Sequence, residues 1–338
     1  MGPMSVDDQL QRPLRDLRIS VTDRCNYRCH YCMPYDEYVW IARDAVLSFE
    51  EITRLAGIFV GLGVEKIRLT GGEPLVRRDL EELISQLASL SGLKDLSLTT
   101  NGSLLAEKAS GLRKAGLDRI NVSLDTLQPK RFETLTRRGE LDQVLEGIQA
   151  AADAGLTPLK INTVMMKGFN DDEILDLVDY CRTGGYEIRF IEYMDVGNAN
   201  AWTPERVLPK KLIQETIHAR YPIEELGRSD GRAPSVDYRY QDGKGKLGII
   251  GSLTEPFCSD CTRARVTADG RLVTCLFSES GFDLKSRLRA SDDDQEIVRA
   301  IRSVWGGRRD RYSEERWKTL KDGGYRSRKK IEMITLGG

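Results

Sequence analysis

Hydrophobic and polar positions alternate along six short segments of the chain, and each segment is followed by a turn and a stretch of helical periodicity. These segments predict β-strands at residues 17–22, 66–70, 95–100, 119–123, 159–164 and 187–192. Predicted helices begin near Phe49, Arg78, Leu104, Leu141 and Asp172. Because strands that alternate with helices form parallel sheets, the pattern predicts an α/β fold, either an open sheet or a barrel.

The two faces of each predicted strand differ in polarity. In the first strand Ile19 and Val21 alternate with Arg18, Ser20 and Thr22. Since helices must cover the apolar face, the polar face is expected to line an interior, unlike the packed core of a closed barrel. The pattern therefore predicts a partly open barrel with a binding cavity.

Four cationic side chains, Arg18, Arg68, Lys160 and Arg189, are expected to point into this cavity. Burying so much unpaired charge is costly, and a polyanionic ligand would neutralise it. The alternative is a set of internal ion pairs, with Asp125 or Glu192 as partners.

The regular alternation stops near Asn198, where a region rich in proline, glycine and charge begins. We therefore expect a barrel domain over residues 1–197 and a C-terminal region over residues 198–338. The 51 basic and 52 acidic residues leave a net charge of -1, so no nucleic-acid partner is expected. The N-terminus has no signal-like apolar segment and no run is long enough to span a membrane, which predicts a cytoplasmic protein with no membrane partner.

Six of the seven cysteines form two triplets, which in a reducing compartment favours metal ligands over disulfides. The first triplet, Cys25, Cys29 and Cys32, directly follows the first strand, at the edge where parallel α/β folds place their active sites. A 4Fe-4S cluster normally takes four cysteines, so three would leave one iron open to a small molecule. Zinc is the alternative, with His30 as the only nearby fourth ligand.

The second triplet, Cys258, Cys261 and Cys275, again offers three thiolates. A zinc ribbon is the alternative here, with Cys181 or His218 as the fourth ligand. Cys181, however, falls on the apolar face of a predicted helix, and His218 lies in a separate amphipathic stretch. Arg263 and Arg265 follow Cys261 and place positive charge beside this triplet, unless they form a solvated strand edge.

Polar turns end the other strands at the edge that carries the first triplet. Gly71-Gly72-Glu73-Pro74 ends the second strand, where glycines allow close backbone approach and a carboxylate can accept hydrogen bonds from an ammonium group. Similar turns at residues 99–102, 123–125 and 191–194 end three more strands. Their coincidence with the cysteine loop predicts an active site at this edge.

The cysteine spacing followed by Gly71-Gly72-Glu73-Pro74 is similar to the radical S-adenosylmethionine enzymes. The segments 21–26, 70–75, 188–195 and 257–265 resemble, more closely, the GTP-cyclising family of molybdenum cofactor biosynthesis. The resemblance covers nearly the whole chain. It implies a partial (β/α)6 TIM-like barrel with a C-terminal extension that carries a second iron-sulfur cluster.

The resemblance also implies the reaction and its participants. Two 4Fe-4S clusters and S-adenosyl-L-methionine are the implied cofactors, and GTP is the substrate. A 5'-deoxyadenosyl radical takes the 3' hydrogen of GTP, the C3' radical attacks C8, and one further electron and a proton give 3',8-cyclo-7,8-dihydro-GTP. A reductant of unidentified nature, a homodimer, and the downstream cyclic pyranopterin monophosphate synthase as a pathway partner complete the implied set.

Site roles follow residue by residue from the same resemblance together with the strand faces. The expected S-adenosylmethionine contacts are Tyr31, Gly72, Glu73, Ser123 and Met194. The expected GTP contacts are Arg18, Arg68, Thr99, Lys160, Arg189, Arg263, Ala264 and Arg265. Catalytic roles are expected for Arg263, Arg265 and the flexible terminal pair Gly337 and Gly338, and the six triplet cysteines are the expected cluster ligands.

Two other functions fit part of the pattern. Another radical S-adenosylmethionine enzyme with an auxiliary cluster could act on a peptide, but its cavity would need no ring of cations. A non-catalytic iron-sulfur or zinc protein would have no use for the Gly72-Glu73 turn beside the cysteine loop.

Overall fold

The computed structural model of the chain describes residues 6–198, 202–321 and 329–337. Within them, twelve strands form one sheet in the order β12-β11-β10-β1-β2-β3-β4-β5-β6-β9-β8-β7. The eight strands from β10 to β9 run parallel. They are β10 (Arg263–Val266), β1 (Asp16–Ser20), β2 (Lys66–Thr70), β3 (Asp95–Thr100), β4 (Arg119–Ser123), β5 (Lys160–Met165), β6 (Glu187–Glu192) and β9 (Lys246–Ile250).

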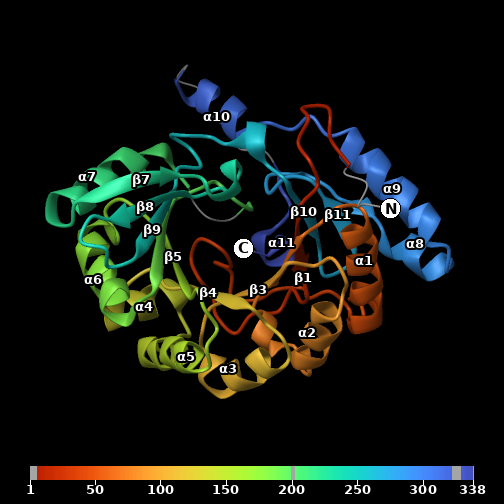
Figure 1. Cartoon of the computed structure of the whole chain (residues 1–338), viewed down its shortest axis with the longest axis horizontal. Helices are drawn as coiled ribbons and strands as arrows, with labels where there is room; N and C mark the ends of the chain where they lie inside the picture. Colours follow the sequence, from red (N-terminus) through yellow and green to blue (C-terminus); the bar gives the residue numbers. More distant parts are fainter. Residues whose placement is uncertain (1–5, 199–201, 322–328, 338) are drawn as a thin grey trace.

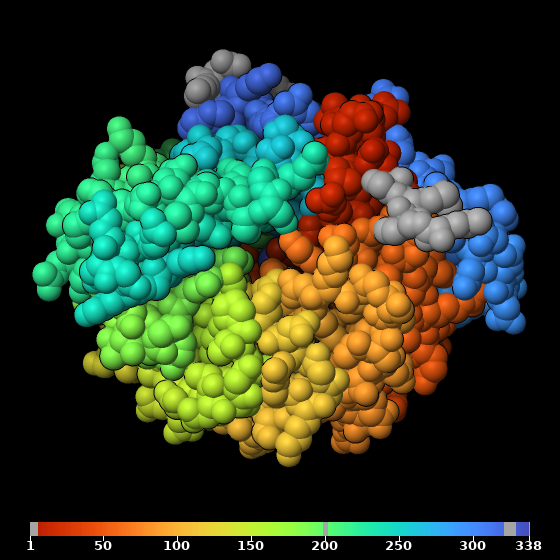
Figure 2. Space-filling view, in the orientation of Figure 1, coloured from red at the N-terminus to blue at the C-terminus, as the bar shows by residue number. Residues whose placement is uncertain are grey.

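Antiparallel strands close both ends of this sheet. They are β8 (Val236–Tyr240) and β7 (Ile223–Gly227) beside β9, and β11 (Arg271–Val273) and β12 (Phe282–Asp283) beside β10. The sheet curls into a barrel (Figure 1). The barrel is open because β9 and β10, at the two ends of its parallel part, do not pair with each other in the described residues. Figure 2 shows this face hollowed at its middle.

Helices cover the outer face of the sheet (Figure 1). Those of the barrel are α1 (Phe49–Gly61), α2 (Leu80–Ala88), α3 (Leu105–Lys114), α4 (Pro129–Thr136), α5 (Leu141–Asp153) and α6 (Ile174–Gly184). The later ones are α7 (Lys210–Arg220), α8 (Lys285–Ala290), α9 (Asp294–Gly306), α10 (Tyr312–Lys321) and α11 (Met333–Leu336). In the described parts of the chain, every helix is too short or too polar to cross a bilayer.

The predicted alternation of strands and helices is confirmed, with local differences. The first strand ends at Ser20 and not at Thr22, although the Val21 N–H still donates to the Thr70 carbonyl of the neighbouring strand at 2.9 Å. Helix α4 was not predicted. The parallel sheet also continues through β9 and β10, which both follow residue 197 and extend the six predicted strands to eight.

The apolar faces of the parallel strands form the core beneath the helices. Ile67 and Leu69 on β2, Ile120 and Val122 on β4, and Ile188 on β6 are all fully buried. Burial of such side chains is the main favourable term in folding. Because side chains alternate across a strand, this burial turns the polar set of residues toward the barrel interior.

The C-terminal segment returns to this interior. Helix α11 lies within the ring of strands (Figure 1). Its Leu336 is fully buried, and the Lys330 ammonium before it donates to the buried Asp195 carboxylate at 2.8 Å. The segment is therefore packed into the mouth of the barrel.

Candidate active site

The first cysteine loop is tied to the glycine turn that ends β2. The Gly72 N–H donates to the Thr22 carbonyl and the Glu73 N–H donates to the Arg24 carbonyl, both at 2.8 Å. A Cβ atom at Gly72 would lie 2.3 Å from the Arg24 oxygen, so only glycine allows this approach. The two motifs lie side by side, as their positions at one edge of a parallel sheet require.

Glu73 is buried beneath this turn and braces the next loop. Its carboxylate accepts hydrogen bonds from Leu75 N (3.0 Å), Thr100 Oγ1 (2.7 Å) and Asn101 N (2.7 Å). Burial raises its pKa to about 7, although these three hydrogen bonds act in the opposite direction. Both oxygens are thus already engaged within the protein, which makes Glu73 a support for the turn; its contact with the cofactor ammonium stays a prediction.

Asn101 connects the same turn to the cysteines. Its side-chain amide donates to Asn26 Oδ1 at 2.9 Å and reaches Cys25 Sγ at 3.9 Å. The sequence interpretation included Asn101 in a polar turn but gave it no role, because nothing in the pattern shows which turn residue faces the cysteines.

The three thiols of the first triplet lie close enough to affect one another. Burial raises the pKa of Cys25 to about 11 and that of Cys32 to about 12, and in Cys32 the neighbouring Cys25 adds to the effect. Burial and the other two thiols also raise the pKa of Cys29. Beside them, Tyr31 donates to Asp125 Oδ2 at 2.7 Å, and burial raises the pKa of Asp125 to about 6.

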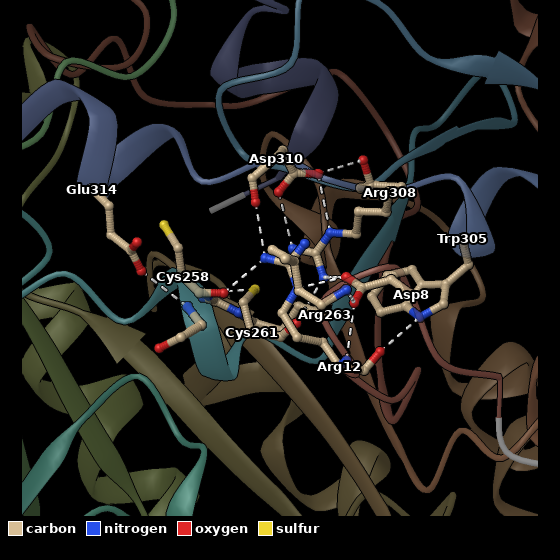
Figure 3. A network of polar contacts seen from close by, with 12 residues as sticks. Asp8, Arg12, Cys258, Cys261, Arg263, Trp305, Arg308, Asp310 and Glu314 are labelled. Carbon is tan, nitrogen blue, oxygen red and sulfur yellow. Dashed lines mark hydrogen bonds and ion pairs between the residues drawn. The ribbon is translucent and has the colours of Figure 1, made fainter.

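The second triplet has a different electrostatic setting (Figure 3). Burial opposes ionisation of Cys261, but the guanidinium groups of Arg263 and Arg308 outweigh it and lower its pKa to about 6. Arg263 Nη2 donates to Cys261 Sγ at 3.3 Å. Burial raises the pKa of Cys275 to about 12. The positive charge at the second triplet therefore comes from Arg263 and Arg308, which act on Cys261.

Both triplets have the donor chemistry of an iron-sulfur site, because thiolates are the usual ligands of such clusters. Among the described residues, no three His, Cys, Asp or Glu side chains converge as ligands of a single ion. The fourth ligands considered for zinc at the second triplet lie elsewhere: Cys181 is buried in α6, and His218 Nδ1 accepts from Ile223 N at 3.2 Å. Three cysteines at each site fit a 4Fe-4S cluster in which one iron has no protein ligand.

The two triplets lie at opposite ends of the barrel. Cys25, Cys29 and Cys32 follow the carboxyl end of β1, whereas Cys261 precedes the amino end of β10, which runs parallel to β1. Cys275 follows β11, whose antiparallel course returns it to the same end. The polar interior of the barrel therefore lies between the two sets of thiols.

Three arginines stand side by side in this interior. The sheet register places Arg18 opposite Arg68 on β2 and opposite Arg265 on β10. Burial, followed by repulsion from Arg265 and Arg263, lowers the pKa of Arg18 well below its usual value, and burial and Arg18 do the same to Arg68. None of the three lies within 4.0 Å of a carboxylate in the described residues. Arg18 and Arg68 belong to the four inward cations predicted from the strand faces, and Arg265 joins them from β10.

Two other inward cations, Lys160 and Arg119, form ion pairs, as the alternative interpretation allowed. Lys160 Nζ lies 2.5 Å from Glu187 Oε2, and not beside Asp125 or Glu192. The sequence interpretation missed Arg119, whose Nε and Nη2 donate to the two oxygens of the Asp95 carboxylate at 2.9 and 2.5 Å. The miss has a simple cause, because Arg119 is the first residue of its strand and the face assignment began at Ile120.

The remaining predicted residues divide by face and position. Arg189 faces the interior opposite Gly248 on β9, and burial lowers its pKa. Ala264 lies between Arg263 and Arg265 but its side chain is fully buried on the apolar face, so only its main chain can face the cavity. Thr99 Oγ1 accepts from Asn121 Nδ2 at 3.4 Å, while Ser123 and Met194 lie at the carboxyl ends of β4 and β6.

The C-terminal tail reaches the cation cluster. Gly337 has a φ of +71°, and its carbonyl accepts a hydrogen bond from Arg265 Nη1 at 2.7 Å. A Cβ atom there would lie 1.9 Å from Thr70 Oγ1, so the position requires glycine. Gly337 thus lies between Arg265, which is predicted to bind the substrate, and the turn that holds Gly72. Gly338 lies outside the described residues.

Comparisons with known proteins agree with this geometry. The radical SAM superfamily model matches residues 19–181, and the molybdenum cofactor synthesis C model matches residues 186–314. The chain is 47% identical over 337 residues to a GTP 3',8-cyclase of Xanthomonas campestris pv. campestris, covering 98% of this chain and 97% of the relative. It is 49% identical over 320 residues to a GTP 3',8-cyclase of Acidothermus cellulolyticus, covering 92% and 88%.

Solved structures share the fold at low sequence identity. Streptococcus suis SuiB bound to S-adenosylmethionine superimposes with a TM-score of 0.61 at 16% identity, over 86% of this chain and 69% of that one. Native anSMEcpe with bound AdoMet gives a TM-score of 0.54 at 15% identity, over 84% and 82%. With relatives that match at nearly full length, the chain belongs to the GTP 3',8-cyclase family of radical SAM enzymes.

Proposed function

We propose that the chain converts GTP to 3',8-cyclo-7,8-dihydro-GTP with S-adenosyl-L-methionine, as the first step of molybdenum cofactor biosynthesis. The observation that carries the proposal is the row of Arg18, Arg68 and Arg265, which have no ion-pair partner in the described residues and lie between two cysteine triplets at opposite ends of one barrel. The full-length relatives named GTP 3',8-cyclase support it. A peptide substrate would leave these charges without a matching anion, so the peptide-modifying alternative is less favoured.

The carboxyl edge of the barrel is the proposed site of S-adenosylmethionine. Cys25, Cys29 and Cys32 would hold the first 4Fe-4S cluster, and the cluster and S-adenosylmethionine, when bound, supply the electron and the 5'-deoxyadenosyl radical. Around them, the proposed contacts from this chain are Tyr31, Gly72, Glu73, Ser123 and Met194. The hydrogen bonds of Glu73 to Thr100 and Asn101 keep the edge rigid, which orients the reactants.

GTP is proposed to fill the interior, with its guanine toward the second cluster at Cys258, Cys261 and Cys275. The triphosphate would be held by cations of the inner face. The proposed substrate contacts are Arg18, Arg68, Thr99, Lys160, Arg189, Arg263, the main chain at Ala264, and Arg265. The tail at Gly337, together with Gly338, would cover the cavity, and Arg265 would hold both the tail carbonyl and the substrate in place.

The larger organisation belongs to the same proposal. Residues 1–197 would supply the S-adenosylmethionine half of the site and residues 198–338 the second cluster. We further propose a cytoplasmic homodimer that takes electrons from a separate reductant and delivers its product to cyclic pyranopterin monophosphate synthase. Each of these partners rests on the family resemblance.

Anaerobic turnover of the reconstituted protein tests the function. With dithionite, S-adenosylmethionine and GTP, mass spectrometry should find 5'-deoxyadenosine together with a cyclised dihydro product that is isomeric with GTP, and ATP should give no cyclised product. Cleavage of S-adenosylmethionine without any change in GTP would refute GTP as the substrate. No cleavage in a sample with both clusters intact would refute the enzyme assignment.

Iron analysis tests the two ligand sets. Roughly eight iron and eight sulfide per chain are expected, in two clusters of four. Cys258→Ala should lower both contents by about half, because the remaining two thiolates hold the second cluster poorly. Cys181→Ala is the matched control, since Cys181 is buried in α6, and it should leave the iron content unchanged. Equal iron contents in the two variants would remove Cys258 from the ligand set.

Kinetics of Lys160→Ala test the triphosphate site. A charge-assisted hydrogen bond contributes about 1.5–3 kcal/mol, so the KM for GTP should rise about tenfold or more. The KM for S-adenosylmethionine should stay near that of the parent. Lys211→Ala is the control, because this lysine is exposed on α7 beside Glu215. An unchanged KM for GTP with full turnover would show that Lys160 does not contact the triphosphate.

A further inference from the structure

Two arginines distant in sequence hold the main chain of the second cysteine loop (Figure 3). Arg12 Nη1 donates to the Cys258 carbonyl at 2.8 Å and to the Asp310 carbonyl at 2.9 Å. Arg308 Nη1 donates to the Cys261 carbonyl at 2.7 Å. Both side chains are buried, so water does not compete for these bonds.

Two carboxylates join these arginines into one network. Asp8 Oδ2 lies 2.5 Å from Arg12 Nε and 3.6 Å from Arg308 Nη1. Arg308 Nε and Nη2 donate to the two carboxylate oxygens of Asp310 at 3.1 and 3.2 Å. Asp310 Oδ2 also accepts from Thr274 Oγ1 at 3.0 Å, next to the third cysteine. The network therefore reaches all three positions of the triplet.

The network also fixes the N-terminal segment to the end of α9. Trp305 Nε1 donates to the Arg12 carbonyl at 3.0 Å, and the Arg308 guanidinium lies 4.6 Å from the centre of the Trp305 ring. Such a scaffold can hold the cysteine loop in one geometry before any cofactor binds.

One donor of the network has no acceptor. Arg12 Nη2 is buried and lacks a hydrogen-bond partner in the described residues, although its companion Nη1 holds Cys258. Unsatisfied buried donors are costly, and those that persist in native proteins call for an explanation. A sulfur-rich anion at the three cysteines is the type of group that such a donor would stabilise.

We propose that Arg12 and Arg308 are positioning residues of the second iron-sulfur cluster, which fix the main chain at its cysteines and raise its reduction potential with their positive charge. This inference rests on the second cluster of the proposed function. Removing the Arg308 charge would leave Asp8 and Asp310 partly unneutralised beside an anionic cluster. Adding an electron to that cluster would then become less favourable.

The test uses the full-length chain with Cys25, Cys29 and Cys32 changed to Ala, so that only the second cluster remains. In this background Arg308→Gln, Arg308→Lys and Arg12→Lys are compared with Arg54→Gln. Arg54 is a matched control because it also pairs with an aspartate, Asp294, and donates to two carbonyls, but away from the cysteines. The measurements are an anaerobic redox titration followed by electron paramagnetic resonance and the rate of iron loss to a chelator.

Arg308→Gln should lower the midpoint potential of the cluster. At the midpoint potential of the background protein, the ratio of reduced to oxidised cluster should fall about tenfold, which corresponds to a potential lower by about 59 mV for one electron. Arg308→Lys keeps the charge, so its ratio should change less than that of Arg308→Gln. Arg308→Lys and Arg12→Lys should both lose iron several times faster than Arg54→Gln, because lysine cannot reproduce the planar fork.

Two results would overturn the inference. The first is a midpoint potential and an iron-loss rate in Arg308→Gln and Arg12→Lys equal to those of Arg54→Gln. If Arg308→Gln fails to fold, the iron-loss rates of the two lysine variants decide alone, and rates equal to the control reject the proposal. The second is a folded background protein that takes up no iron or sulfide, which refutes the second cluster itself and so contradicts the proposed function as well.

Discussion

Repulsion among buried cations is the constraint on which the rest of this structure depends. Arg18, Arg68 and Arg265 occupy adjacent positions on three parallel strands, with no carboxylate of the described residues within ion-pair distance. A buried charge of one sign is stable only when an opposite charge or strong dipoles face it. The Gly337 carbonyl supplies one dipole to Arg265, but a carbonyl does not neutralise three guanidinium groups. The interior is thus preorganised for an anion with several charges.

The surrounding structure concentrates this charge in one place. Lys160 and Arg119 share the polar face but are each paired, with Glu187 and Asp95 respectively. Arg18, Arg68 and Arg265 lie on β1, β2 and β10, and near β10 Arg263 and Arg308 also lower the pKa of Cys261. At the opposite end Arg28 donates to the Cys25 carbonyl at 2.9 Å, but burial outweighs its charge and raises the pKa of Cys25. Cys261 therefore differs from Cys25 in the direction of its pKa shift, because two guanidinium groups outweigh its burial.

Much of this could be predicted from the sequence because it depends on local patterns. Alternation along each strand placed Arg18, Arg68 and Lys160 on the inner face, and the carboxyl-edge rule placed the Gly72 turn beside the first cysteines. The parallel strands β9 and β10 could not be predicted in the same way. β9 follows α7 and the antiparallel strands β7 and β8, and β10 follows a loop after β9, so neither continues the repeat of one strand and one helix that marked the first six units.

Contacts between residues far apart in sequence also escaped prediction. Nothing near Lys160 indicates that Glu187 is its partner, because the pairing depends on the β5–β6 register. The supports of the second cysteine loop, Arg12 and Arg308, are separated from it by 246 and 47 positions. Periodicity has no information on such pairs, and only the folded chain brings them together.

The most direct test of this account compares how nucleotides stabilise the cluster-loaded protein. The unfolding temperature is measured anaerobically in the presence of GTP, GMP or guanosine at equal concentration, at low and at high salt. A ligand that binds only the native state raises this temperature, and at equal concentration the rise is larger for a ligand of higher affinity. The account predicts the largest rise with GTP, a smaller one with GMP, the least with guanosine, and a loss of the differences at high salt. Equal stabilisation by GTP and guanosine would contradict it.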